Sequence, residues 1–192
     1  PEKVDAVPVG AEPGAFAHVK PRRVHDGKTR VLFYGQLIPL HGVETILHAA
    51  LSDQGKAYHW HIIGSGQEQA LVAEALEGAN ASNVTWDPWV PYSELATAIE
   101  ASDICLGIFG TSDKAASVVP NKVYQSLFAQ RPVITRDSPA IREVFTASDP
   151  GLRLVPAAAP QAIITAIAAL ETEGFPTLDT NLLASAQPAT IA

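Results

Sequence analysis

The chain has 192 residues, of which 47% are hydrophobic and 17% charged, and its formal net charge is -7 at pH 7. This length supports one sizeable domain with a hydrophobic core. The acidic balance argues against a nucleic-acid or anionic-membrane partner, because such partners attract a basic surface. The single cysteine, Cys105, excludes a disulfide framework and a cysteine zinc cluster. It is interpreted as a small core residue in a reducing compartment.

No apolar run reaches the roughly 20 residues that a membrane span needs, and no signal-peptide pattern is present. We therefore expect a cytoplasmic protein. The chain begins at Pro1 and contains no methionine, so we also expect it to be part of a longer protein.

Short apolar runs alternate with helical patterns along the chain. Strands are predicted at 30–35, up to Ile63, and at 83–86, 104–109, 131–135 and 152–156. The helices between them are marked by apolar residues at i, i+3, i+4 and i+7, as in 43–50, and by turn signals such as Gly78. Pro120 is predicted at the first helical position of one helix, and Ser138 with Pro139 at the start of the next. This alternation predicts an α/β, Rossmann-like parallel sheet with helices on both faces.

Ligands of open parallel sheets bind beyond the carboxyl ends of the strands, where helix N-termini converge. The loops predicted there are 35–42, 64–66, 87–92 and 110–121. Three of the four contain glycine, which lets a backbone approach a ligand closely.

Several common kinds of functional site are not predicted. The stretch "GSGQEQ" supplies two glycines of a dinucleotide fingerprint, but the third position is Gln69 and the motif follows the second strand. His59 and His61 share a strand face, yet no third ligand follows at a plausible spacing, so no metal site is predicted. No nucleophile elbow, zinc-protease motif or P-loop occurs.

Lys122 lies in the first turn of the helix that opens at Pro120, where the helix macrodipole disfavours a cation. Two interpretations are open. The side chain faces a bound diphosphate together with the helix amides, or it extends into solvent.

Five blocks, in order and at matching spacing, resemble the C-terminal, donor-binding half of GT-B glycosyltransferases, particularly the retaining family four. They are "VPVGAEPGAF", "VLFYGQLIPLHGVETILHAA", "HIIGSGQEQALVAEAL", "VTWDPWVPYSELATAIEASDICL" and "PNKVYQSLFAQRPVI". The resemblance implies an interdomain crossover at 1–26, a nucleotide-sugar-binding domain at 27–175 and a tail at 176–192. It also implies a missing N-terminal acceptor domain, and we expect any peripheral membrane contact to run through that domain.

The resemblance implies a nucleotide diphosphate sugar as donor, no cofactor and no divalent metal. The donor contacts fall on the predicted loops, with the base near Trp89 and Val90. The other donor-binding positions are Gly35, Gln36, Gly42, Gly64, Ser65, Gly66, Lys114, Val118, Val119, Pro120, Asn121, Lys122 and Gln125. The positions that correspond to catalytic residues of the family are His41 and Ser117.

Four positions depart from the family pattern. Gln36 and His41 stand where the family has arginine and lysine, and Ser117 and Gln125 stand at its Glu-x7-Glu pair. Glutamine offers only a neutral hydrogen bond, and histidine needs protonation near its ordinary pKa of about 6.5 to hold a phosphate by charge. We therefore expect donor affinity to weaken as pH rises past the pKa of His41.

The sequence thus predicts the donor-binding domain of a bacterial glycosyltransferase of hexosyltransferase type, retaining in mechanism and active in polysaccharide biosynthesis. Alone, this fragment is expected to bind donor without turnover. The alternatives are a catalytically degenerate GT-B module with a structural or regulatory role, and a nucleotide-sugar epimerase.

Overall fold

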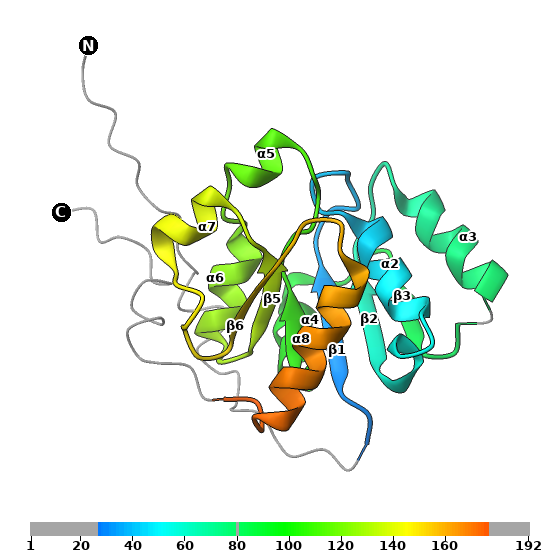
Figure 1. The fold of residues 1–192 in the computed structure, drawn as a ribbon. Coiled ribbons are helices and arrows are strands. Elements are labelled where there is room, and N and C mark those ends of the chain that lie inside the picture. The colour runs from blue at the N-terminus through cyan, green and yellow to red at the C-terminus, as the bar shows by residue number, and fades with distance from the viewer. Residues whose placement is uncertain (1–26, 80, 177–192) are drawn as a thin grey trace.

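The computed structural model describes residues 27–79 and 81–176 and shows one parallel sheet between two layers of helices (Figure 1). The strands are β1 (Arg30–Tyr34), β2 (His59–Ile63), β3 (Val84–Asp87), β4 (Ile104–Leu106), β5 (Val133–Arg136) and β6 (Leu152–Val155). The helices are α2 (Val43–Leu51), η1 (Gly55–Ala57), α3 (Gln69–Ala79), α4 (Tyr92–Ala101), α5 (Asp113–Ala116), α6 (Asn121–Phe128), α7 (Pro139–Val144) and α8 (Pro160–Thr172). The predicted fold class is confirmed.

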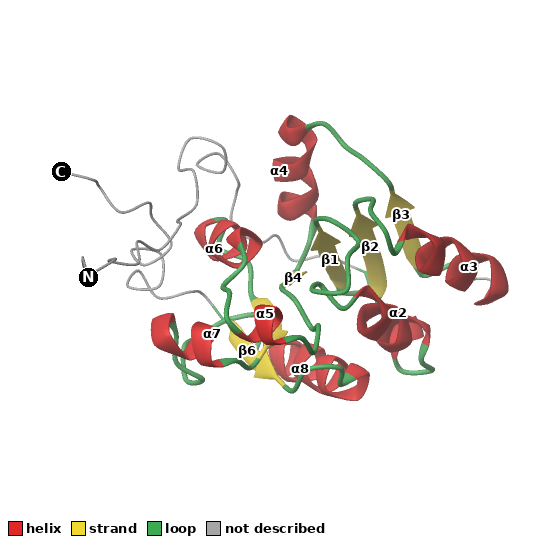
Figure 2. Cartoon of the chain, turned by 90° about the horizontal axis from the view of Figure 1, so that it is seen from above, coloured by secondary structure: helices red, strands yellow, loops and turns green. Residues whose placement is uncertain are grey.

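The sheet order is β3-β2-β1-β4-β5-β6, and every pairing is parallel. The sheet runs between the two helical layers when it is seen from above (Figure 2). Helices α2, α3 and α8 pack on one face, where the largest hydrophobic cluster includes Phe33, Trp60 and Ile167. Helices α4, α6 and α7 cover the other face, and Cys105 is fully buried there, as predicted.

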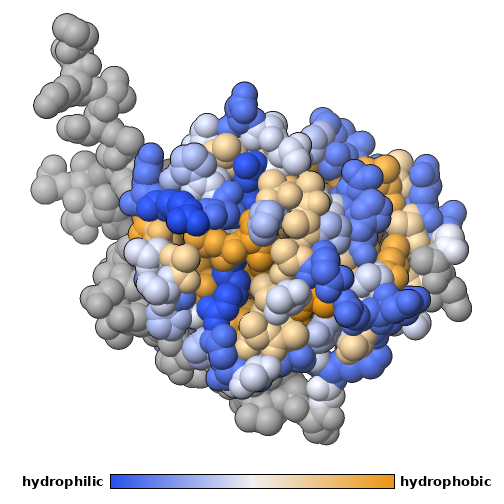
Figure 3. Space-filling model, in the orientation of Figure 1, coloured by the Kyte–Doolittle hydropathy of each residue, from blue (hydrophilic) through white to orange (hydrophobic). Residues whose placement is uncertain are grey.

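The surface over α2 and α8 mixes hydrophilic and hydrophobic residues, with apolar atoms gathered between α7 and α8 (Figure 3). Within the described part of the chain, no helix is both long and apolar enough to cross a membrane. The predicted crossover at 1–26 and most of the predicted tail lie outside the described residues, so the domain boundaries stay predictions.

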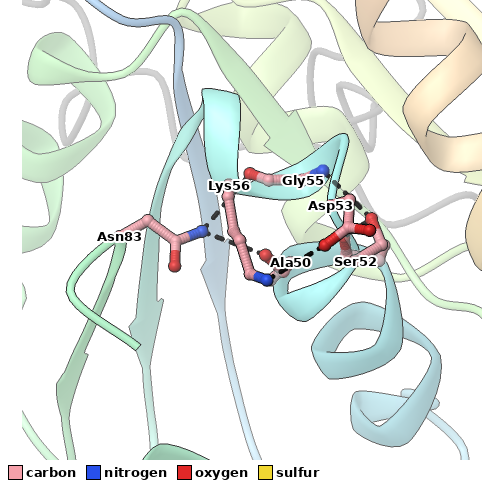
Figure 4. Close-up of polar contacts among 7 residues, drawn as sticks. Ala50, Ser52, Asp53, Gly55, Lys56 and Asn83 are labelled. Carbon is pink, nitrogen blue, oxygen red and sulfur yellow. Dashed lines mark hydrogen bonds and ion pairs between the residues drawn. The ribbon is translucent and has the colours of Figure 1, made fainter. Parts of the chain in front are cut away.

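The amino end of the sheet is held by a network of polar contacts (Figure 4). The side-chain amide of Asn83 donates to the carbonyl oxygens of Ala50 at 3.0 Å and Gly55 at 3.3 Å. The Gly55 amide in turn donates to the Ser52 hydroxyl at 3.0 Å. These bonds satisfy the end of α2 and fix the entry to β2.

The structure corrects three expected boundaries. Pro120 is the N-cap of α6 and not its first helical residue, and α3 continues past Gly78 to Ala79. Strand β4 ends at Leu106 and not at Phe109, and beyond it the Ile108 amide donates to the Thr135 hydroxyl at 3.2 Å while the Arg136 amide donates to the Ile108 carbonyl oxygen at 2.9 Å. The Ser138 cap is confirmed, since its hydroxyl accepts from the Ile141 amide.

Candidate functional site

The candidate site lies at the carboxyl ends of the strands, where the strand order reverses between β1 and β4. A sheet of this order leaves a crevice at the reversal point, since the connections after the two strands run to opposite faces. Helix α2 follows β1 and packs in the α8 layer, whereas α6 follows β4 and packs in the other layer. Both helices begin without a side-chain cap hydrogen bond, at Gly42 and Pro120. Their first amide groups are therefore free of side-chain competition for an anion.

Two glycines allow the loops after β1 and β4 to pack closely against each other. A β-carbon on Gly42 would lie 2.7 Å from the Gly110 amide nitrogen, and Gly42 has a left-handed backbone with φ 66°. The Phe109 amide also donates to the His41 carbonyl oxygen at 3.0 Å. Only glycines allow this approach, so the two loops form one rim of the crevice.

The turns after β1 and β2 are joined in a similar way. The Gly35 amide donates to the Ile63 carbonyl oxygen, and the Leu37 amide donates to the Ser65 carbonyl oxygen, both at 2.9 Å. A β-carbon on Gly64 would overlap the Gly35 carbonyl oxygen. The structure thus brings the predicted residues of the first two glycine turns side by side.

A pocket of about 470 Å³ opens beside these turns. Its lining is mostly apolar and includes the exposed aromatic side chains Trp89 and Tyr92 at the end of β3 and the start of α4. None of the described residues that line it carries a charged side chain. Six predicted donor-binding residues line the pocket, namely Gly35, Gln36, Gly64, Ser65, Trp89 and Val90. Its flat aromatic walls suit a planar, uncharged ring such as a nucleobase.

Lys122 reaches the same turn from the other side of the crevice. Its side chain is only 6% exposed, and its ammonium nitrogen lies 2.8 Å from the point where a β-carbon on Gly35 would stand. The nitrogen also lies 4.0 Å from the centre of the Phe33 ring and has no hydrogen-bond partner among the described residues. Burial lowers the pKa of Lys122 to about 7. The interpretation that Lys122 extends into solvent is therefore wrong.

His41 packs over the same point. Its ring is 3.3 Å from the Gly35 β-carbon position and stands edge-on to Phe33, and its Nδ1 donates to the Gln36 carbonyl oxygen. Burial, and after it the neighbouring Lys122, lower the pKa of His41 to about 4. The sequence-based expectation of a titration near 6.5 is wrong for this ring, because the ring is half-buried and lies beside the Lys122 amine. At neutral pH His41 is an uncharged hydrogen-bonding group.

The predicted site residues on the segment before α6 do not all lie close to the pocket. The Ser117 hydroxyl is exposed and donates to the Asp113 carbonyl oxygen at 2.8 Å, which closes the end of the short helix α5. Lys114 and Asn121 are exposed, whereas Val118, Val119, Pro120 and Gln125 are half-buried. Neither Ser117 nor Lys114 lines the pocket at the first two turns.

Sequence reasoning missed two contributors to the site. Tyr34 lines the pocket, and its hydroxyl donates to the Lys122 carbonyl oxygen at 3.2 Å and lies 3.1 Å from the Ser126 hydroxyl. Arg136 binds the carbonyl oxygens of Gly110 and Ser112 from the end of β5. Tyr34 and Arg136 each stand at the last position of a strand, and this position is the sequence signal that could have identified them.

No group of three or more histidine, cysteine, aspartate or glutamate side chains that could hold a metal occurs among residues 27–79 and 81–176. The Nε2 of His61 instead lies 2.7 Å from the Asp87 carboxylate, on the sheet face beside α4.

Six parallel strands in this order, with glycine turns and a pocket at their carboxyl ends, define a Rossmann-like ligand-binding domain. The sequence model of the family "Glycosyl transferases group 1" matches residues 28–173. The chain belongs to this family, and the resemblance to GT-B glycosyltransferases is confirmed. No curated protein sequence matches the chain.

Solved structures with the same fold include sucrose-phosphate synthase from Thermosynechococcus elongatus, at 18% identity and a TM-score of 0.71 over 94% of this chain and 47% of that one. Anabaena Alr3699/HepE, solved with UDP and glucose, matches at 15% identity and a TM-score of 0.66 over 83% of this chain and 44% of that one. The C-terminal domain of LpcC from Francisella tularensis matches at 16% identity and a TM-score of 0.61 over 93% of this chain and 89% of that domain. The chain thus spans about half the length of the first two proteins.

Proposed function

We propose that this chain is the donor-binding half of a glycosyltransferase that moves a sugar from a nucleotide diphosphate sugar to a glycan, lipid or small acceptor. The observation that carries the proposal is the pairing at Gly35 of an uncharged aromatic pocket with a buried, unpaired ammonium group. A nucleotide sugar has two parts that complement these features. Its uncharged planar base suits the aromatic pocket, and its negatively charged diphosphate suits the ammonium group. Anabaena Alr3699/HepE, which shares the fold, was solved with UDP and glucose.

The reaction needs stabilisation of a leaving nucleotide diphosphate. Negative charge grows on this group as the bond to the sugar breaks, and helix amides with a nearby cation stabilise it without a metal ion. The free amide groups at the starts of α2 and α6 and the amine of Lys122 are the groups available here. A retaining, metal-independent mechanism of family four type is part of the proposal, as are a cytoplasmic location and a role in bacterial polysaccharide biosynthesis.

The acceptor is proposed to bind a preceding domain that is not part of this chain. The fragment should therefore bind donor without transferring sugar. Binding can be measured by calorimetry and thermal shift with UDP, GDP and ADP and their glucose or mannose derivatives, with and without magnesium. Micromolar to millimolar binding of one base series, independent of magnesium, is the expected result. A chain that binds none of these compounds is not a donor-binding domain.

One observation favours a second candidate, a catalytically degenerate module with a structural or regulatory role. Ser117 and Gln125 replace the family's acidic pair, and the Ser117 hydroxyl is already bound to Asp113. Joining the chain to its preceding domain and assaying sugar transfer separates the two candidates, since a degenerate module would bind donor and transfer nothing. The same product analysis would reveal an epimerase, the remaining alternative.

A further inference from the structure

The ammonium group of Lys122 is an unusual buried group, because the described residues give it no hydrogen-bond partner. A buried charge without a partner costs several kcal/mol, and proteins normally pair such a group or neutralise it. The position on α6 adds to the cost, since the first turn of a helix disfavours a cation. Both costs fall if an anion binds beside the amine.

Within the described part of the chain, the groups that face Lys122 do not supply that anion. From the β1–α2 loop it meets His41, which is uncharged at neutral pH. From β1 it meets the Phe33 ring, and the adjacent Tyr34 is a phenol whose pKa burial raises well above its ordinary value. Its own helix contributes the Ser126 hydroxyl, which lies beside that of Tyr34. The amine is therefore left for a ligand.

Lys114, a cation on the 110–121 loop, is exposed and does not line the pocket beside the Gly35 turn. The Gln36 side chain is exposed and neutral, and the Gln36 carbonyl oxygen is occupied by His41. Arg136, the cation at the end of β5, donates through Nη1 to the carbonyl oxygens of Gly110 and Ser112, although its buried Nε has no hydrogen-bond partner among the described residues. A diphosphate at the Gly35 turn would thus find its nearest full charge on Lys122.

We propose that Lys122 carries the positive charge that pairs with the donor's diphosphate, in place of charged side chains at positions 36 and 41, and that it takes up a proton when the donor binds. This inference rests on the proposed donor-binding function. The lysine stem is flexible, so a small shift of its tip past Gly35 and the His41 ring exposes the amine to the pocket. The amine thus lies beneath the turn in the free protein and becomes fully protonated when an anion binds beside it.

Proton uptake follows from the burial of the amine. In the free protein the pKa of Lys122 is lowered to about 7, so at pH 8 most molecules hold a neutral amine. A bound diphosphate raises this pKa, because an opposite charge favours the protonated form. Affinity should therefore be highest below pH 7 and fall by up to about tenfold per pH unit above it.

The test is calorimetry with UDP-glucose on the whole 192-residue chain, in buffers of different ionisation enthalpy, at pH 6, 7 and 8. UDP-glucose is replaced by GDP-mannose or ADP-glucose if only that compound binds. We expect the wild type to take up a growing fraction of a proton from pH 6 to pH 8. Lys122→Met should lose affinity by about 10- to 100-fold, as expected for the loss of a charged hydrogen bond.

Lys122→Arg is the second variant, because arginine stays charged throughout this range. It should bind without proton uptake and with an affinity that is flat in pH. Lys56→Met is the matched control, since Lys56 is an exposed lysine paired with Asp53 at the opposite end of the sheet. It should behave as the wild type, and thermal unfolding checks that every variant is folded.

The outcomes separate the two proposals. If the wild type binds no nucleotide sugar at all, the donor-binding function itself fails. If the wild type binds and Lys122→Met binds within twofold of it, the function stands and the role of Lys122 is overturned. Proton uptake that persists in Lys122→Arg would also overturn it, because another group would then be titrating.

Discussion

The ammonium nitrogen of Lys122 lies 4.0 Å from the centre of the Phe33 ring, so strand β1 and helix α6 share a buried cation at the crevice. The ring face attracts the cation, but such a contact contributes only about 2 kcal/mol when desolvated. That is less than the cost of burying an unpaired charge. The buried Lys122 charge at the candidate site therefore lowers the free energy of unfolding.

This cost predicts the effect of Lys122→Met on stability. Burial lowers the pKa of Lys122 from 10.5 to about 7. Between these pH values the unfolded chain binds a proton that the folded chain lacks, so this group makes stability rise with pH. Below pH 7 both states are charged and the full cost is present. Lys122→Met should be more stable than the wild type at pH 6, by about 5 kcal/mol at most.

The advantage of Lys122→Met should shrink towards pH 10, and urea unfolding at pH 6, 8 and 10 measures it. Lys56→Met, which removes an exposed lysine, should show no such trend. A constant difference between Lys122→Met and the wild type across this range would mean that Lys122 is charged in the folded state throughout.

A second prediction concerns the exposed aromatic residues of the pocket. Trp89 is 75% exposed and Tyr92 is 54% exposed, so neither contributes much to the core. If the base stacks on them, each alanine variant should weaken UDP-glucose binding by about 5- to 100-fold, because base stacking on an aromatic ring is worth about 1–3 kcal/mol. The melting temperature should stay close to that of the wild type.

Leu71→Ala serves as the control for that experiment, since Leu71 is an exposed apolar residue on α3 that does not line the pocket. If the Trp89 and Tyr92 variants bind UDP-glucose as tightly as the wild type, the base does not bind in this pocket.

A third prediction compares two glycines. A β-carbon on Gly64 would overlap the Gly35 carbonyl oxygen, and Gly64 has φ 146°, whereas nothing lies within 4 Å of a β-carbon on Gly78. Gly64→Ala should lower the free energy of unfolding by about 2 kcal/mol or more, through strain and a displaced turn. Gly78→Ala, inside α3, should raise it by about 0.5–1 kcal/mol. Chemical denaturation of both variants distinguishes a joined pair of turns from two independent ones.

A fourth prediction concerns Arg131, which is fully buried on the α4 and α6 side. Its guanidinium donates to the carbonyl oxygens of Ile99, Glu100 and Ala129 at 3.0 Å, joining the ends of α4 and α6. Arg131→Met should cost about 3 kcal/mol or more, because buried carbonyl groups lose a charged donor. Arg142→Met, which removes the exposed partner of Asp137, should change the urea midpoint little.

The fold could be predicted from the sequence because the patterns that define its strands and helices are local. Each strand is a short apolar run that a glycine, polar or proline turn ends, and the helices between them have clear apolar stripes. Helix α5 was missed, since its four residues carry no apolar period and only the Ser112 cap marks it. The end of β4 was also misplaced, because the apolar run continues to Phe109 while the regular strand ends at Leu106, where the pairing with β5 becomes irregular.

The site was only partly predictable, for a similar reason. The ligand-facing loops follow from the glycines at strand ends, whereas Trp89 and Val90, which line the pocket, were placed there by the resemblance to glycosyltransferases. The burial of Lys122 does not, because Phe33 and Gly35 surround it from a segment almost half the chain away. The uncharged state of His41 depends on the same contact. Properties that a distant segment imposes on a side chain leave no trace in the local pattern.

The contact between Gly42 and Gly110 has a consequence for the thermodynamics of binding. Because the loops after β1 and β4 are already packed and hydrogen-bonded to each other, their backbone entropy is lost during folding and not during ligand capture. A ligand that binds here would meet a preorganised rim on this side of the crevice. Affinity in this half of the site then depends on the few side chains that still move, and chiefly on the lysine stem beneath the turn.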